Sequence, residues 1–210
     1  MAKRAYAAED KQRRRNAIIQ AARHLFAAGD GDLPAVALVA DAAGLAKGTV
    51  YLYFRTREAI FAEVLLEGWS EVLADLAVVF ATGTNSSHQV AAFLAGFVAY
   101  LDRHSELLRL DALGAGVLER NLKPEALRRF KHTLVERLAA GGAVVDHALG
   151  LAPGRGLRLL MRTYALTRGL WQSIGADQNQ DSILFQGDFK GELAEALAEY
   201  WRGALAAPDA

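Results

Sequence analysis

The stretch Val39-Ala-Asp-Ala-Ala-Gly-Leu-Ala-Lys-Gly-Thr-Val-Tyr-Leu-Tyr-Phe54 decides the fold of this chain. Its apolar spacing predicts two short helices, from Pro34 to about Ala43 and from Ala46 to about Phe54, with Gly44 as a left-handed turn residue between them. Two short helices joined by a glycine-containing turn form a helix-turn-helix. Because the second helix of such a motif lies in the major groove of DNA, the stretch predicts a DNA-reading head.

The inner side of this motif is apolar and small. Ala40, Ala43 and Gly44 let the two helices approach closely. A small core is expected from Val36, Val39, Leu45 and Val50 against Phe26 of the preceding helix.

The outer side of the second helix carries the residue types that DNA requires. Lys47 and the hydroxyls of Tyr51 and Tyr53 suit phosphate oxygens, which fix position without reading sequence. Thr49 can bond a base or contact a thymine methyl, and Gly48 lets the backbone come close to base edges. Arg55 and Arg57 begin the next helix, whose N-terminal amides favour a phosphate. The predicted DNA contacts are Lys47, Gly48, Thr49, Tyr51, Tyr53, Arg55 and Arg57.

A second interpretation of the same residues involves no DNA. The motif would then be a plain helical hairpin with Tyr51, Tyr53 and Phe54 in its core. The exposure of these side chains separates the two interpretations.

The rest of the chain is predicted to be helical, because alternating runs typical of strands are missing. A first helix is expected from about Glu9 to Ala28, with Asp32 as the cap of the second. Gly141-Gly142 is expected to kink its helix. The later helices are expected at about Thr56–Phe80, Ser87–Arg103, Ser105–Leu113, Pro124–Leu149, Pro153–Gly175 and Asp188–Ala206. The fold class is therefore all-α, with a head at residues 1–55, a connecting helix at about 56–80 and a C-terminal helical domain at 81–210.

The composition favours a buried core, and the net charge differs between the two parts of the chain. Of 210 residues, 52% are hydrophobic and 23% charged, which suits a buried core of some size. Residues 1–60 hold 10 Lys and Arg against 6 Asp and Glu, a net of +4, and the remainder hold 14 against 18, a net of −4. A basic head on an acidic body indicates that the head meets a polyanion. Ordinary scatter explains a net of +4 equally well.

Location and cofactors are inferred from what the sequence lacks. Cysteine is absent, so disulfides and thiolate metal sites are excluded. No signal-peptide pattern and no apolar run long enough for a membrane span is seen, and we expect a cytoplasmic protein without a membrane partner. No cofactor and no metal is expected.

The sequence disfavours two other classes of protein, an enzyme and a coiled-coil interaction protein. An enzyme needs a convergent set of catalytic groups, whereas the five histidines are scattered and the pair His132 and Glu136 suits a surface contact. The glycines at Gly114 and Gly116 follow no strand, so they do not predict a dinucleotide loop. A coiled-coil interaction protein would need sustained heptads, which are missing.

The stretch resembles the tetracycline-repressor (TetR) family pattern, Ile-Ala-x-x-Ala-Gly-Val-Ser-Lys-Gly-Thr-Leu-Tyr-x-Tyr-Phe followed by Lys-x-Glu-x-Leu-Phe. The matching residues are Val39-Ala40, Ala43-Gly44-Leu45, Lys47-Gly48-Thr49-Val50-Tyr51, Tyr53-Phe54, Arg57-Glu58 and Ile60-Phe61. Two departures remove polar groups: Ala46 stands where the family has serine, and Leu33-Pro34-Ala35 replaces a Thr/Ser helix opening.

The resemblance implies a regulator that binds double-stranded operator DNA as a homodimer and is released by a small, largely apolar effector. By this analogy the C-terminal half would hold the effector, with Trp69, Phe93, Phe97, Tyr100, His104 and Tyr164 as pocket candidates. Its last two long helices would form the dimer, with Leu157, Leu160, Met161, Trp171, Leu197 and Trp201 as interface candidates. Ordinary core packing of these apolar residues is the alternative.

Overall fold

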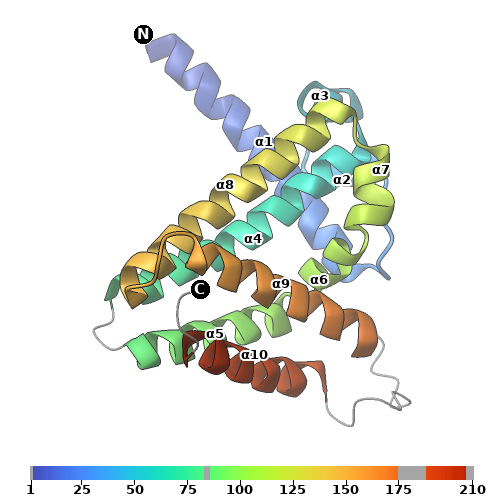
Figure 1. Ribbon diagram of the computed structural model, residues 1–210. Helices are drawn as coiled ribbons and strands as arrows, with labels where there is room; N and C mark the ends of the chain where they lie inside the picture. The colour runs from blue at the N-terminus through green and yellow to red at the C-terminus, as the bar shows by residue number, and fades with distance from the viewer. Residues whose placement is uncertain (1, 83–85, 175–187, 207–210) are drawn as a thin grey trace. The chain divides into compact units, whose positions relative to one another are not determined.

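The computed structural model describes residues 2–82, 86–174 and 188–206, and within these ranges it contains helices joined by turns and loops and no strand. The predicted all-α class is confirmed (Figure 1). The elements are α1 (Ala2–Ala28), α2 (Val36–Ala42), α3 (Lys47–Tyr53), α4 (Arg57–Thr82), α5 (Ser86–Arg103), α6 (Ser105–Ala112), the π-helical turn η1 (Gly114–Leu118), α7 (Glu119–Asn121), α8 (Pro124–Leu149), α9 (Arg155–Ile174) and α10 (Phe189–Ala206).

The chain forms two compact units. The first contains the residues up to Gly68 together with Arg109–Phe130, and the second contains Trp69–Leu108 and the residues from Lys131 onward. By packing, Arg109–Phe130 therefore belongs with the head, although it lies within the predicted C-terminal domain. None of the described helices is long and apolar enough to cross a membrane.

The core of the first unit is built around Phe26 of α1. Phe26 is fully buried and its ring lies 5.8 Å from that of Phe61 in α4. Val39 of α2 and Val50 of α3 are fully buried as well, so each of the two short helices contributes an anchor to the core. Gly44 adopts φ +66° after α2, which confirms the predicted left-handed turn residue.

Several helix boundaries differ from the sequence-based expectation. α1 begins at Ala2 and not near Glu9. α2 begins at Val36, with Ala35 in extended conformation as its N-cap, so Asp32 does not cap it. Proline fixes only its own φ and leaves ψ open, so its presence is compatible both with the first turn of a helix and with the segment before it. In the structure Pro34 lies before α2.

Arg109 of α6 holds the end of α1 in the first unit. Its guanidinium donates to the carbonyl oxygens of Gly29 (2.9 Å) and Ala27 (3.1 Å) and lies 5.6 Å from the Phe26 ring centroid. The last carbonyls of a helix have no partner within it, and a planar guanidinium satisfies two of them at once. Since about eighty residues separate the partners, local sequence patterns do not indicate this contact.

The second unit is organised around α10, which packs against α9 and α5 (Figure 1). Trp201 of α10 is fully buried, with its ring 5.7 Å from that of Phe93 in α5. At its exposed edge α10 is tied to α5 by Lys190, whose Nζ lies 2.7 Å from Asp102. The hydrogen bond and charge of the Asp102 carboxylate raise the pKa of Lys190.

One glycine of α8 and one of α9 allow a close helix crossing. A Cβ added at Gly142 would lie 2.5 Å from the backbone nitrogen of Leu157, and one added at Gly156 of α9 would lie 2.2 Å from the carbonyl oxygen of Gly142. α8 runs unbroken from Pro124 to Leu149 through Gly141 and Gly142. These glycines therefore serve helix–helix contact with α9.

This contact predicts an unusual response to alanine. Gly142→Ala should lower the free energy of unfolding by about 1–3 kcal/mol, because backbone atoms of α9 must move, although alanine favours helix. Gly96→Ala is the matched control, since nothing lies within 4 Å of its added Cβ, and it should stabilise by up to about 1 kcal/mol. Urea unfolding of both variants measures the difference. Equal or greater stability of Gly142→Ala would contradict the close crossing.

Candidate nucleic-acid interface and apolar cavity

A tight turn sets α3 against α2. The amide of Leu45 donates to the carbonyl of Ala40 (2.9 Å) and that of Gly44 donates to Asp41 (3.1 Å). Val50 is the one side chain of α3 that is buried, with none of its surface exposed. Since residues three or four positions apart share a face of a helix, burial of Val50 turns the opposite face outward.

The outward face of α3 combines a cation, a glycine whose backbone no side chain covers, and two large side chains. Lys47 and Gly48 are exposed, Tyr51 retains 41% of its surface and Leu52 retains 82%. Arg55, which follows the helix, is exposed too. A face of this kind is suited to phosphate contact at the cations and to close approach at Gly48.

The other predicted contacts lie at the flanks or are engaged inside the head. Thr49 and Tyr53 are half-buried beside Val50. Arg57 donates to the carbonyl of Leu33 (3.0 Å) and pairs with Glu58 (3.4 Å). Thr56 accepts a hydrogen bond from the amide of Ala59 (3.1 Å), so one of the first amides of α4 already has a partner. The structure thus places Arg57 as a brace of the loop before α2.

The plain-hairpin interpretation fits one of its three residues. Phe54 is 5% exposed and lies under the guanidinium of Arg15 (5.3 Å), which also pairs with Glu63 at 2.7 Å. Tyr51 is on the surface and Tyr53 is half-buried. Only Phe54 therefore belongs to the core.

Sequence reasoning missed Leu52. It carries the most exposed large apolar side chain among those the structure describes. The signal was available in the spacing, because Leu52 lies four residues after Gly48 and so on the same face of the helix.

Both short helices lack a side-chain cap. Ala35 and Ala46 stand at the N-cap positions of α2 and α3 in extended conformation, and neither makes a side-chain cap hydrogen bond. The loss of a cap expected from Ala46 in the sequence is thus seen in the geometry.

A serine at this position should restore the cap. Ala46 already has φ −67° and ψ 142°, the backbone that a capping serine adopts. Ala46→Ser should raise the free energy of unfolding by about 1 kcal/mol and Tm by about 2–4 °C. Ala74→Ser, on the exposed surface of α4, should instead cost about 0.5 kcal/mol because serine is a poorer helix former than alanine. Thermal unfolding checks both, and an unchanged Tm for Ala46→Ser would rule out the missing cap.

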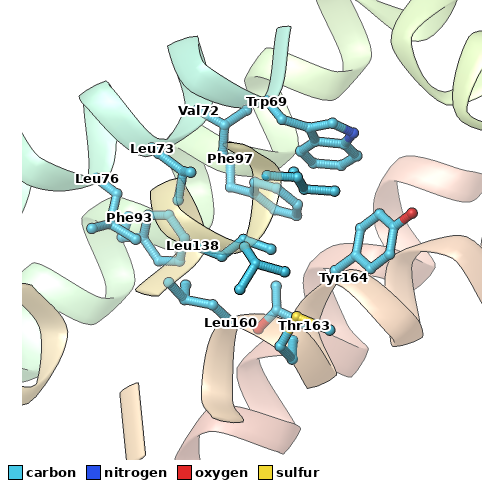
Figure 2. Close-up of a pocket in the computed structure, with 13 residues that line it drawn as sticks. Trp69, Val72, Leu73, Leu76, Phe93, Phe97, Leu138, Leu160, Thr163 and Tyr164 are labelled. Atoms are coloured by element: carbon cyan, nitrogen blue, oxygen red, sulfur yellow. The ribbon is translucent and has the colours of Figure 1, made fainter. Parts of the chain in front are cut away.

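The second unit contains an apolar cavity of about 140 Å³ between α4, α5, α8 and α9 (Figure 2). Its wall is formed by Trp69, Val72, Leu73, Leu76, Phe93, Phe97, Leu134, Val135, Leu138, Leu160, Met161, Thr163 and Tyr164. Four of the six pocket candidates from the sequence lie in this wall: Trp69, Phe93, Phe97 and Tyr164.

The other two candidates lie elsewhere. The hydroxyl of Tyr100 donates to Glu71 (2.5 Å), and its ring contacts that of His104 in a tilted arrangement at 4.6 Å. His104 contacts Glu106 at 3.3 Å. Neither Tyr100 nor His104 lines this cavity: Tyr100 bonds to Glu71 of α4, and His104 contacts Glu106 of α6.

The interface candidates are mostly interior. Leu197 and Trp201 are fully buried within the protomer and Leu160 is 5% exposed at the cavity, so these three cannot meet a second chain in this conformation. Leu157 and Trp171 are half-buried, and Trp171 packs edge-on against Phe189 at 5.0 Å. Met161 remains 45% exposed. The candidates on α10 and Leu160 of α9 thus lie in the core, whereas Met161 of α9 stays on the surface.

Among the described residues, no group of three His, Asp or Glu side chains is arranged to hold a metal ion. His132 and Glu136 form an exposed pair at 3.2 Å, which confirms the predicted surface contact.

Comparison with known proteins gives a consistent result. A family model for bacterial regulatory proteins of the tetR family matches residues 18–64, and one for the tetracyclin repressor-like C-terminal domain matches residues 66–208. A TetR-family transcriptional regulator from Mesorhizobium loti is 25% identical with a TM-score of 0.65, over 93% of this chain and 96% of that chain. A search of curated proteins found no match.

Two further solved structures share the fold at lower identity. A TetR transcriptional regulator from Rhodococcus is 19% identical with a TM-score of 0.59, over 90% of this chain and 96% of that chain. The transcriptional regulator FadR from Bacillus subtilis, solved with stearoyl-CoA, is 19% identical with a TM-score of 0.52, over 86% and 96%.

Proposed function

Because the chain belongs to the TetR family of bacterial transcriptional regulators and is a DNA-binding regulator, we propose that it represses transcription from a pseudo-palindromic operator and is released by a small apolar effector. The outward face of α3 carries this proposal. A short helix anchored by Val50 presents Lys47, Gly48 and Tyr51 to solvent. This is the arrangement that a major groove receives.

The exposed residues of α3 take different roles on DNA. Lys47, Arg55 and the hydroxyl of Tyr51 contact phosphates and set the register. Gly48 brings the backbone close to base edges, and Leu52 packs on the apolar surface that thymine methyls or sugars offer. Thr49, half-buried at the flank, reads one base step.

Gly48→Ala should have opposite effects on folding and on DNA binding. Nothing in the protein lies within 4 Å of the added Cβ, so the helix gains up to about 1 kcal/mol. The methyl group occupies space at the DNA surface, and affinity for the selected operator should fall about tenfold or more. Urea unfolding and fluorescence anisotropy measure the two effects, with Gly96→Ala as the control for stability alone. Unchanged affinity would remove Gly48 from the interface.

Variants at Lys47 and Thr49 distinguish a phosphate contact, which positions the helix on DNA, from a contact that reads a base. Lys47→Ala should weaken binding to operator and random DNA alike and reduce the salt slope by about 1, as expected for one lost phosphate contact. Thr49→Ala should change preference at one base step. The affinities of both variants for operator and for random DNA are measured between low and physiological salt. If Thr49→Ala lost equal affinity for both DNAs, Thr49 would not read a base.

A homodimer is proposed through the exposed faces of α9 and α10. The small exposed residues Ala165 and Gly169 on α9 allow close helix approach. On the same face Arg158 and Arg162 are exposed, whereas α10 exposes the acidic residues Glu195 and Glu199. These opposite charges suit pairing between two copies. The dimer places two α3 helices in successive major grooves, about 34–36 Å apart or somewhat more.

Effector control is proposed to act through α4. Ile60 and Phe61 of α4 are buried in the head, and Trp69, Val72 and Leu76 of the same helix line the cavity. An effector in the cavity then favours a conformer whose heads do not fit the operator spacing. By linkage, operator and effector weaken each other's binding by the same factor.

The test begins with selection of genomic DNA fragments by the purified full-length protein in the cytoplasmic range of salt. A single enriched pseudo-palindrome, and higher transcription of its neighbouring gene when the regulator is deleted, are the expected results. Lower transcription on deletion would exclude repression. An effector that binds the protein without weakening operator binding would exclude release.

A further inference from the structure

We propose that the cavity of the second unit binds an uncharged single aromatic ring of about the size of benzene or toluene. The inference rests on the proposed role of this cavity as the effector site and goes further by naming the chemical class. Four observations carry it: the polarity of the wall, its volume, its aromatic rings and its exposed edge.

The wall contains no ionisable acid, base or histidine. Trp69, Thr163 and Tyr164 are its only side chains with polar atoms besides the sulfur of Met161. In Figure 2 the hydroxyl of Tyr164 is at the far end of its ring from Leu76, Phe93 and Leu160. A charged ligand would lose its water here without meeting an oppositely charged side chain among the described residues of the wall, which strongly disfavours it.

The hydroxyl of Thr163 is engaged within the protein. It donates to the carbonyl oxygen of Leu159 (2.9 Å) and accepts from the indole nitrogen of Trp201 (2.8 Å). Its single proton is therefore used, and a ligand carbonyl or carboxylate finds no donor in it. Arg168, which lies over the Tyr164 ring at 5.6 Å, has other partners as well and does not line the cavity.

The volume limits the ligand to one ring. The cavity measures about 140 Å³. Apolar cavities of about 150 Å³ engineered in another protein stay dry and bind benzene. A fused ring system or a long acyl chain does not fit into this space without movement of the wall.

The arrangement of the wall rings favours an aromatic ligand over an aliphatic one. Trp69 and Tyr164 meet edge to face at 5.3 Å, and Phe93 and Phe97 lie 5.9 Å apart. A bound ring placed beside these two pairs adds further edge-to-face contacts, which a saturated ring lacks.

The route from solvent lies at α8 and α9. Val135 of α8 is 60% exposed and Met161 of α9 is 45% exposed, although both line the cavity. Met161 has a flexible side chain that can move aside without strain. These two residues form the edge through which a ring enters.

Titration of the DNA-free, full-length protein with toluene, methylcyclohexane and benzoate tests the proposal. Calorimetry and quenching of tryptophan fluorescence should show saturable binding of toluene at one site per chain. Methylcyclohexane should bind about threefold more weakly or worse, and benzoate about a hundredfold more weakly or not at all. Absence of toluene binding, or methylcyclohexane or benzoate binding as tightly as toluene, would overturn the proposal.

Variants locate the site. Leu138→Phe fills the cavity and should lower toluene affinity about tenfold or more, whereas Val78→Phe, on an exposed position of α4 outside the wall, should leave it unchanged. Val135→Phe covers the entrance at an exposed position and provides a second variant if Leu138→Phe fails to fold. Toluene binding that survives both substitutions would place the ligand elsewhere.

Operator release is measured separately by anisotropy. Toluene binding without release would refute the effector role while leaving the ligand class intact. Release by a compound that competes for the cavity and is not an aromatic ring would support the effector role and overturn the ligand class.

Discussion

Burial of Val50 is the contact on which the DNA-reading surface depends. A helix of seven residues is marginal in water, because few hydrogen bonds repay the cost of its first turn. α3 therefore exists by virtue of its contact with the head, and Val50 is its one buried side chain. The same contact decides which residues of α3 face outward, and these are the residues proposed to contact DNA.

The core that receives Val50 is held by ties between distant segments. Arg109 satisfies carbonyls at the end of α1, Arg57 holds the loop at Leu33, and Arg15 links Phe54 to Glu63. Each arginine uses its planar group for two contacts, for which the fixed fork of donors in a guanidinium is suited. Basic residues of the head thus serve its structure as well as its meeting with DNA, and the net charge of the head overstates what is available for phosphates.

The second unit combines close helix packing with an unfilled space. Its helices pack closely where glycine permits, at Gly142 and Gly156, and leave a space where large apolar residues meet. The hydrogen bond from Trp201 to Thr163 joins α10 to the wall of that space. Close packing in one part of the unit keeps a core, while the cavity in another part leaves volume for the proposed ligand.

The motif from Val39 to Phe54 was predictable in detail, since its turn, its anchor and its outward face follow from local spacing. The all-α class follows in the same way from helical periodicity and the lack of strand patterns. Periodicity alone did not reveal the π-helical turn Gly114–Leu118, because two glycines in an apolar run read as an ordinary helix. It also showed that α9 and α10 are amphipathic without showing what their apolar sides meet.

Tertiary structure decided the rest. Leu197 and Trp201 carry the pattern of an interface and prove to be core, while Trp69, Phe93, Phe97 and Tyr164 come together at one cavity from three helices. Arg57, a predicted phosphate contact by its chemistry, also donates a hydrogen bond to a carbonyl of its own head. The sequence by itself determined the all-α class, most of the long helices and the anchor of α3, because those depend on residues within one or two turns. Which apolar face is buried, and which polar group already has a partner, depends on residues distant in the chain and is settled only when the helices pack.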